Sequence, residues 1–223
     1  APMKDSGVEW LGEVPAHWAL LRVKFVCSFT TSGPRGWSEL VGETGSLFIQ
    51  SGDLSDTPSV NFAGSKRVQI GNDAEAKRTA LCNGDVVVCI TGAKTGNVAL
   101  CDVVPEDAYI NQHLCLIRPT SIVASAFLAI QLKSSLGQTY FELSQYGLKQ
   151  GLSLENVREA PVLVPPLTEQ NAMVSYLNAE AEKFDLLCAK AQQSKELLQE
   201  RRTALISAAV TGKIDVRDWQ AAA

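Results

Sequence analysis

The sequence predicts a mixed α+β globular domain followed by a long helix that can form a coiled coil. Up to residue 166, Gly and Pro separate short apolar runs, a pattern typical of strands and turns. Beyond Pro166, no Gly or Pro occurs before Gly212, which is typical of one long helix. We therefore expect a globular domain over 1–166, a helix over 167–212 and a short tail over 213–223.

Five apolar runs in the globular domain are predicted to be strands because turn-forming Gly, Asn and Asp residues lie between them. These runs are Leu47–Gln50, Val68–Ile70, Asp85–Thr91, Val98–Asp102 and His113–Arg118. Between Ser121 and Tyr146 the apolar residues recur at helical spacing, so we expect this stretch to be helical. The residues that carry the helical pattern are Phe127, Ile130, Leu132 and Leu136.

The predicted C-terminal helix has recognisable ends. Thr168 is a suitable N-cap, Leu167 can form a hydrophobic staple, and Gly212 is a suitable C-cap. A helix of about 43 residues is roughly 65 Å long. It would therefore extend beyond a 165-residue domain, whose radius of gyration is about 15 Å.

Steps of four and three residues along this helix follow one mostly apolar stripe. We expect the stripe to face another helix in an intermolecular or spacer coiled coil, and the alternative is an ordinary surface helix packed on its own domain. The residues that we assign to the coiled coil are Met173, Leu177, Phe184, Leu187, Ala191, Leu198 and Leu205. The polar or small residues Glu180, Ser194, Arg201 and Ala208 complete the stripe.

The overall composition is that of an ordinary globular protein, with 46% hydrophobic and 20% charged residues. No apolar stretch approaches the roughly 20 residues that span a bilayer, so we expect no membrane association. The first residues lack a signal-peptide pattern. The cysteines form no CxxC pair, and we expect reduced, structural thiols in a cytoplasmic protein. They stand at positions 27, 82, 89, 101, 115 and 188.

The net charge of −4 argues against unaided binding to nucleic acid, because such proteins usually carry a basic face. The first 165 residues contain 13 Lys and Arg against 16 Asp and Glu, and the remainder contains 7 against 8. DNA binding would therefore need a local basic patch or positive charge from a partner.

Catalytic motifs are incomplete in this sequence, which favours a binding module without catalytic residues or metal ligands. The segment 164–167 contains Pro-Pro but lacks the polar and aromatic residues of the DNA amino-methyltransferase loop. In the segment 91–95, Ala93 breaks the Gly-Lys-Thr core of a phosphate loop, and the upstream Gly is missing. Asp53, Glu75 and Lys77 fit only the loosest nuclease pattern. The chain has two histidines. We expect His17 to be packed and His113 to be a structural residue whose hydrogen bonds are made within the protein.

Turn-like segments provide the polar side chains that could contact DNA. Arg and Lys suit guanine edges or phosphates, while Gln and Asn suit adenine edges. The alternative for each residue is a solvated loop position. The candidate DNA contacts are Arg35, Trp37, Lys66, Arg67, Lys77, Arg78, Lys94, Thr95, Asn97, Gln145, Lys149 and Gln150.

Four motifs, in order along nearly the whole chain, resemble the specificity subunits of type I restriction-modification systems. They are Lys4–Trp18, Gly84–Gly92 followed by Asn111–Arg118, Gly151–Gln170 and Ala204–Val216. The resemblance implies that residues 1–166 form a target recognition domain, which reads one half of a bipartite DNA site. It also implies that the helix sets domain spacing and docks methyltransferase subunits.

The chain departs from the family pattern because it has one recognition domain and one helix where family members usually have two of each. It is therefore either a natural half subunit or an excised fragment. Pairing through the helix as a two-fold homodimer would restore the two-domain arrangement, and the two domains would read inverted half-sites.

The resemblance implies double-stranded DNA, methyltransferase subunits, restriction subunits and a second copy as partners. It implies no cofactor in this chain, with S-adenosylmethionine, ATP and Mg bound by the partner subunits. The alternative function is an antirestriction-type scaffold that binds methyltransferase subunits without reading DNA.

Overall fold

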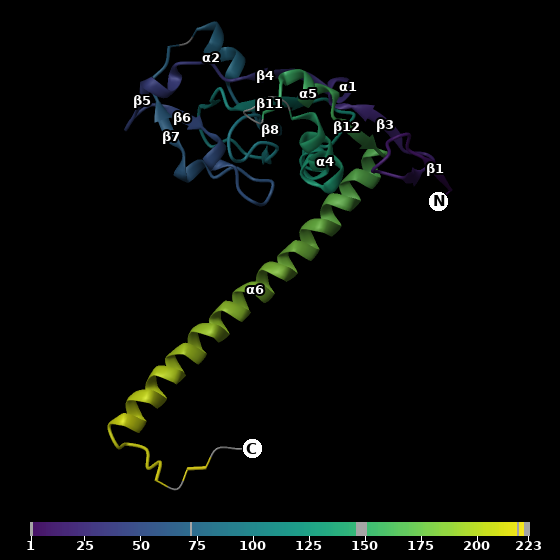
Figure 1. Ribbon diagram of the computed structural model, residues 1–223. Helices are drawn as coiled ribbons and strands as arrows, with labels where there is room; N and C mark the ends of the chain where they lie inside the picture. Colours follow the sequence, from purple (N-terminus) through teal and green to yellow (C-terminus); the bar gives the residue numbers. More distant parts are fainter. Residues whose placement is uncertain (1, 72, 146–150, 218, 221–223) are drawn as a thin grey trace. The chain divides into compact units, whose positions relative to one another are not determined.

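The computed structural model describes residues 2–71, 73–145, 151–217 and 219–220 (Figure 1). By their internal contacts the residues divide into two compact units, Ala1–Val174 and Ser175–Ala223. The first unit is the α+β domain and includes the first two turns of the long helix α6 (Leu167–Val210). The predicted α+β domain followed by a long C-terminal helix is confirmed. Among the described residues, no helix is long and apolar enough to cross a membrane.

A four-stranded antiparallel sheet in the order β4-β11-β8-β9 forms the centre of the domain. In β8 the whole run from Asp85 to Cys89 is buried, because both faces of this sheet are covered. The predicted strands 85–91, 98–102 and 113–118 lie in this sheet. Its strands are β4 (Cys27–Ser32), β8 (Asp85–Cys89), β9 (Val98–Cys101) and β11 (Leu114–Pro119).

A second four-stranded sheet has the order β10-β6-β7-β5, in which β10 and β6 are parallel and the other pairs are antiparallel. The strand predicted at 68–70 begins earlier, so Lys66 and Arg67 are strand residues and not loop residues. The strands are β5 (Val41–Gly42), β6 (Ser46–Ile49), β7 (Lys66–Val68) and β10 (Ala108–Ile110).

Two antiparallel pairs of short strands close the amino-terminal side of the domain. The first 22 residues supply three of these strands, and the fourth runs directly into α6. The pairs are β1 (Met3–Asp5) with β2 (Glu13–Pro15), and β3 (Ala19–Arg22) with β12 (Pro161–Val164).

Short helices connect the strands, and those other than the helix at 74–79 pack on one face of the central sheet. The stretch 121–146, which the sequence predicts to be helical, contains two helices that meet at Ser134, whose backbone is extended (φ −72°, ψ 172°). The helices are α1 (Val23–Val26), α2 (Ala74–Thr79), α3 (Ser125–Lys133), α4 (Ser135–Ser144) and α5 (Leu154–Glu159). Three 3-10 turns span Trp37–Leu40, Ser51–Asp53 and Phe62–Gly64.

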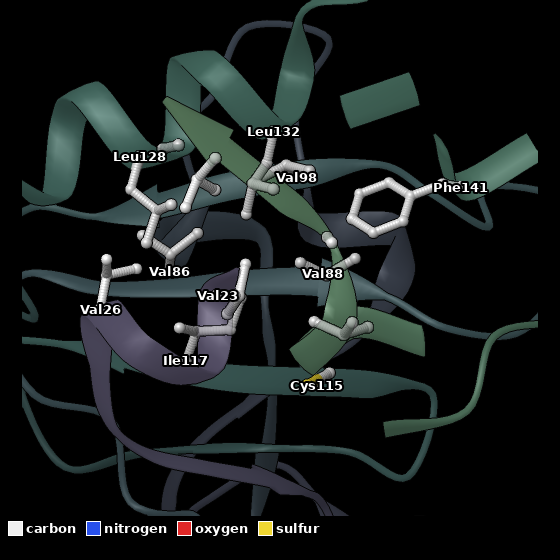
Figure 2. Close-up of a cluster of buried hydrophobic side chains, with 14 of the residues drawn as sticks. Val23, Val26, Val86, Val88, Val98, Cys115, Ile117, Leu128, Leu132 and Phe141 are labelled. Carbon is white, nitrogen blue, oxygen red and sulfur yellow. The ribbon is translucent and has the colours of Figure 1, made fainter. Parts of the chain in front are cut away.

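The central sheet separates two hydrophobic cores. Alternate residues of its strands, such as Val86 and Val88, face the helices and pack with Leu128 and Phe141 (Figure 2). The intervening residues, such as Val87, pack against the second sheet. The period-2 alternation of side chains along each strand thus builds three layers: helices, central sheet and second sheet.

Three of the cysteines, Cys89, Cys101 and Cys115, are buried in these cores. Burial raises the pKa of each of these thiols, so they remain protonated and behave as small apolar residues. Cys27 is half-buried, whereas Cys82 and Cys188 are exposed, so the expectation of structural thiols fits only the buried positions.

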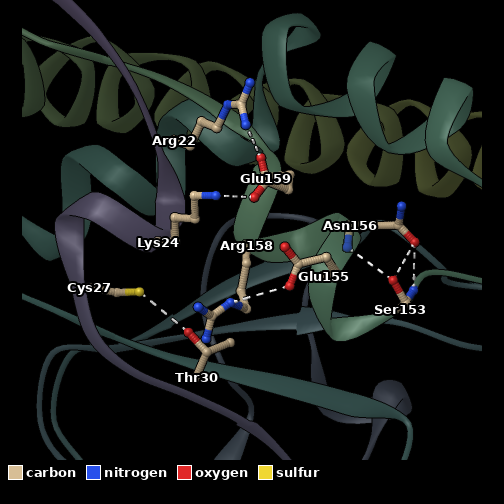
Figure 3. A network of polar contacts seen from close by, with 9 residues as sticks. All are labelled: Arg22, Lys24, Cys27, Thr30, Ser153, Glu155, Asn156, Arg158 and Glu159. Carbon is tan, nitrogen blue, oxygen red and sulfur yellow. Dashed lines mark hydrogen bonds and ion pairs between the residues drawn. The ribbon is translucent and has the colours of Figure 1, made fainter.

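Polar contacts join α5 to the amino-terminal strands (Figure 3). The Glu159 carboxylate accepts hydrogen bonds from Arg22 and Lys24. The Lys24 ammonium lowers the pKa of Glu159, so the carboxylate stays charged in this contact. Ser153 caps α5, because its hydroxyl accepts from Asn156 N at 3.0 Å. These contacts tie β3 and α1 to the segment that leads into α6.

Helix α6 begins in the domain through contacts of its first turn. Buried Gln170 donates to Pro165 O (2.8 Å) and Ile122 O (3.1 Å), and its Oε1 accepts from Ala124 N (2.8 Å). The Pro166 carbonyl accepts the first helical hydrogen bonds, so the predicted N-cap Thr168 lies inside the first turn.

Gly212 and His17 lie near opposite ends of α6. Gly212 has a φ of +73°, a left-handed conformation that Gly adopts without a steric cost, and the helix ends two residues before it. At the other end, His17 Nε2 lies 2.9 Å from a Glu169 oxygen and is exposed. The prediction that His17 is packed is therefore wrong, because its ring serves as a surface partner of the helix.

Candidate nucleic-acid interface

Three loops meet at the end of the central sheet where β8 finishes and β11 begins. They are the β6 loop (50–56), the hairpin loop (90–97) and the β10 turn (111–113), and together we call them the loop cluster. Asn111 N donates to Ile49 O at 3.0 Å, and Ile90 N donates to His113 O at 2.9 Å. These backbone bonds hold the three loops side by side.

Lys94 lies exposed on the hairpin loop and connects it to the β6 loop. Its ammonium donates to Leu54 O at 3.0 Å and to Gly52 O at 3.5 Å. The neighbouring Thr95 is half-buried and donates to Gly92 O at 2.7 Å, within its own loop. Lys94 therefore presents a positive charge at the surface of the loop cluster, where a phosphate or a base edge could reach it.

Asn97 uses its full hydrogen-bonding capacity inside the domain. Its Nδ2 donates to Leu54 O and Ser55 O, both at 3.3 Å. Its Oδ1 accepts from Val98 N at 3.0 Å and from the Lys133 ammonium. A side-chain amide has two donors and two acceptor sites, so none is left for DNA. Asn97 is a structural residue, which corrects its prediction as a DNA contact.

The β10 turn contributes polar side chains that include one missed by the sequence analysis. His113 Nδ1 lies 2.5 Å from Thr91 Oγ1, which agrees with its expected structural role. Gln112 Nε2 lies 3.4 Å from His113 Nε2, and Gln112 Oε1 is buried without a hydrogen-bond partner among the described residues. A buried carbonyl oxygen of this kind calls for a water or a ligand donor. In the sequence Gln112 resembles an ordinary loop residue, so only its place in this turn identifies it as a candidate.

Three of the predicted basic contacts are exposed on other parts of the domain. Arg35 lies on the loop before the 3-10 turn at 37–40, Lys66 on β7 and Lys77 on α2. The Arg35 loop starts beside the loop cluster, because a Cβ at Gly33 would lie 2.2 Å from Ile110 O. The structure thus brings the start of this loop close to the β10 turn.

Two other predicted contacts are occupied by partners within the domain. Arg67 pairs with Glu106 through two nitrogens, at 2.8 and 3.1 Å, and this hydrogen bonding lowers the pKa of Glu106. Arg78 donates to Ser32 O at 2.8 Å and to the Thr31 hydroxyl. Both guanidinium groups stabilise neighbouring segments and have fewer donors left for DNA than the sequence suggests.

Trp37 is a core residue, contrary to the prediction that it lies exposed on a flexible loop. Its side chain is 7% exposed and packs with Phe48 and Tyr109, with ring centroids 6.4 and 5.8 Å apart. A buried indole cannot stack on a base. Gln145, at the end of α4, is half-buried, and Lys149 and Gln150 lie outside the described residues.

The loosest nuclease pattern does not form a site. The Asp53 carboxylate accepts from Gln50 N at 2.8 Å and so closes its own 3-10 turn, and burial raises the pKa of Asp53. Glu75 pairs with Arg78 on α2, at 3.7 Å. Each carboxylate therefore has a local structural partner.

The stripe predicted on α6 is exposed beyond the first two turns. Leu177, Phe184, Leu187, Leu198 and Leu205 are between 43% and 64% exposed. Met173 differs, because it packs against the hydrophobic core of the domain and belongs to the base of the helix. Exposed large apolar side chains in a row of this kind mark an interaction surface.

These features define a class of protein: a recognition module that joins a polar loop cluster on a rigid sheet to a long helix with an apolar stripe. Comparison with known families gives the particular one. The model of the type I restriction modification DNA specificity domain matches residues 39–196. Because this match covers well over half of the chain, the chain belongs to that family.

A curated relative supports this assignment. The specificity subunit of the type I restriction enzyme EcoKI from Escherichia coli (strain K12) is 28% identical over 104 residues. The aligned region covers 44% of this chain and 22% of that subunit.

Solved structures share the fold. One chain comes from work on complex assembly and conformational transition of the type I R-M system; it has a TM-score of 0.70 at 19% identity and covers 93% of this chain. The HsdS subunit from Thermoanaerobacter tengcongensis has a TM-score of 0.65 at 18% identity and covers 95% of this chain. In both cases this chain spans 48% of the matched chain, about half its length.

Proposed function

We propose that this chain reads DNA sequence for a type I restriction-modification complex, with one half of a bipartite target read by each recognition domain. The observation that carries the proposal is the family match over 39–196, because the matched segment contains the whole loop cluster. In this role the chain directs methyltransferase and endonuclease subunits to the site.

Among the predicted contacts, the exposed residues are the best candidates to meet DNA. Lys94 offers an ammonium on the loop cluster, and Arg35 lies on the loop that starts beside it. Lys66 and Lys77 are suited to phosphate contacts further along the domain surface. Thr95, Gln145, Lys149 and Gln150 remain proposed contacts from the sequence, and Arg67 and Arg78 would act with the hydrogen-bond donors that they retain.

We further propose that two copies pair through α6 as an antiparallel coiled-coil homodimer. The exposed apolar stripe on α6 supports this pairing, because a row of large apolar side chains at heptad spacing is usually buried against another helix. A two-fold dimer of this kind holds two identical recognition domains, which would read inverted half-sites. The spacing between half-sites would then depend on the length of the helix.

The expected partners explain how an acidic chain can act on DNA. Methyltransferase subunits that bind S-adenosylmethionine, and restriction subunits that use ATP and Mg, would supply basic surface for the cytoplasmic complex. The net charge of −4 also motivates the second candidate function. In that alternative, the chain is an antirestriction-type scaffold that sequesters methyltransferase subunits and leaves DNA unread.

Selection from a randomised duplex DNA library tests the proposal. The full chain is assembled with its methyltransferase subunits, and bound duplexes are recovered and sequenced. Reading of DNA predicts one enriched bipartite motif, which changes when Arg35→Ala or Lys94→Ala is used. A complex that assembles and enriches no motif would favour the scaffold. A motif that appears equally with methyltransferase alone would also contradict the proposal.

A further inference from the structure

The corner between α3 and α4 lies directly behind the loop cluster. Gly137 makes this corner possible, because a Cβ there would lie 2.3 Å from Leu132 O and 2.5 Å from Leu132 Cα. Only a residue without a side chain allows α4 to approach the end of α3 so closely. The corner brings Lys133 at the end of α3 and Gln138 in α4 next to the hairpin loop.

Lys133 contacts two loops of the cluster at once. Its ammonium donates to Asn97 Oδ1 on the hairpin loop and lies 3.5 Å from Ser55 O on the β6 loop. The Asn97 Nδ2 group in turn donates hydrogen bonds to Leu54 O and Ser55 O, each at 3.3 Å. The three-way contact fixes the separation of the two loops.

Gln138 supports the hairpin loop from the same side. Its Nε2 donates to Gly96 O at 3.0 Å and to Leu132 O at 2.8 Å. Gly96 has a φ of +89°, and a Cβ there would lie 3.4 Å from Gln138 Oε1. The backbone of the hairpin loop is therefore held in a left-handed conformation against α4.

Both side chains are half-buried, in contrast to exposed Lys94. Burial lowers the pKa of Lys133, and the nearby Asp56 carboxylate opposes this effect while Lys94 adds to it. An ammonium in such surroundings depends on the acceptors that surround it. Both ammonium groups donate to the β6 loop, but Lys133 is half-buried, whereas exposed Lys94 also faces solvent, where a ligand could reach it.

We propose that Lys133 and Gln138 are positioning residues that set the conformation of the loop cluster and thereby determine DNA sequence selectivity without touching DNA. This inference rests on the proposed function. Base contacts discriminate only when donors and acceptors are held in place, so loosening the loops reduces selectivity more than overall affinity. The residues that distinguish targets therefore extend to a helix corner outside the loops.

The experiment compares Lys133→Met, Lys133→Arg and the charge-matched control Lys213→Met in the full chain. In the free protein, hydrogen exchange at backbone amides of 50–56 and 91–97 is expected to rise about tenfold in Lys133→Met, because a charged hydrogen bond is lost. Lys133→Arg is expected to restore most of the protection, and Lys213→Met to match the unmodified chain. Gln138→Leu provides a second variant with increased exchange in 91–97.

DNA binding is measured in the methyltransferase complex with the enriched duplex and a scrambled duplex. Lys133→Met is expected to lower the ratio of the two affinities about tenfold, with the salt dependence of binding unchanged. Lys94→Met, as a phosphate contact, is expected to lower the slope of log affinity against log salt by about 0.9.

Several outcomes would overturn the inference. Unchanged exchange in Lys133→Met would exclude a positioning role, and a reduced salt slope would make Lys133 a direct phosphate contact. Failure of the unmodified complex to select any sequence would refute the proposed function separately, and the exchange measurement would still decide whether Lys133 holds the loops.

Discussion

At the scale of single residues, Asp85 and Arg118 show how polar groups hold this domain together. The Asp85 side chain is 1% exposed and accepts two hydrogen bonds from Arg118, both at 2.8 Å. It also accepts from Cys82 N at 2.7 Å, while Arg118 reaches Ala80 O at 3.2 Å. The pair thus joins β8, β11 and the segment that follows α2.

Removing the arginine from this pair should destabilise the domain strongly. Arg118→Met leaves a buried carboxylate without its counter-charge and is expected to lower the free energy of unfolding by about 3 kcal/mol. Asp85→Asn should cost less, because the Arg118 side chain is 35% exposed and can be hydrated. Urea unfolding monitored by circular dichroism measures both variants. A larger loss for Asp85→Asn would contradict this account of the pair.

The sequence could predict the candidate site only at positions where the type of residue alone indicates that its side chain is exposed. The exposure of Lys94 on a Gly-containing loop was predictable, since an ammonium usually stays near water. The hydrogen bonds that the Asn97 side chain makes within the domain were not predictable, because its partners lie some forty residues away in sequence. Trp37 and Lys133 show the same limit: tertiary packing decides that one is core and that the other reaches the loop cluster.

At the scale of elements, the long helix was predictable and the helical stretch before it was predictable only in part. Local chemistry determines α6, because no Gly or Pro interrupts the sequence from Leu167 to Val210. The break at Ser134 has no such signal, since it depends on the close approach of Gly137 to Leu132. The pairing of strands in the two sheets was not predictable from local sequence, because it joins segments that are far apart along the chain, as the parallel pair β6 and β10 shows.

The apolar stripe of α6 makes a prediction about association. Leu187→Glu together with Leu198→Glu should convert a dimer to a monomer, because charges would be buried in the helix pair. Light scattering should show half the mass, with helix content by circular dichroism retained. The matched control is Leu186→Glu with Leu197→Glu, at exposed positions rotated by about 100° on the helix. Equal masses for the two double variants would contradict pairing through this stripe.

At the scale of the whole molecule, the acidic balance of the chain bears on how it would act on DNA. A net charge of −4 does not suit an independent DNA-binding protein, because such proteins usually carry a basic face. Partners that supply charge and a second copy that supplies the other domain would together complete the proposed reader.

Methylation mapping by single-molecule sequencing tests whether this chain gives a methyltransferase complex its DNA specificity. Genomic DNA is compared from cells that contain the methyltransferase subunits with and without this chain. If two copies of the chain read DNA, modification is expected at one bipartite motif only when the chain is present, with the two halves forming an inverted repeat. An unchanged methylation pattern would contradict a role in DNA specificity, and a motif with two unrelated halves would contradict reading by two identical domains.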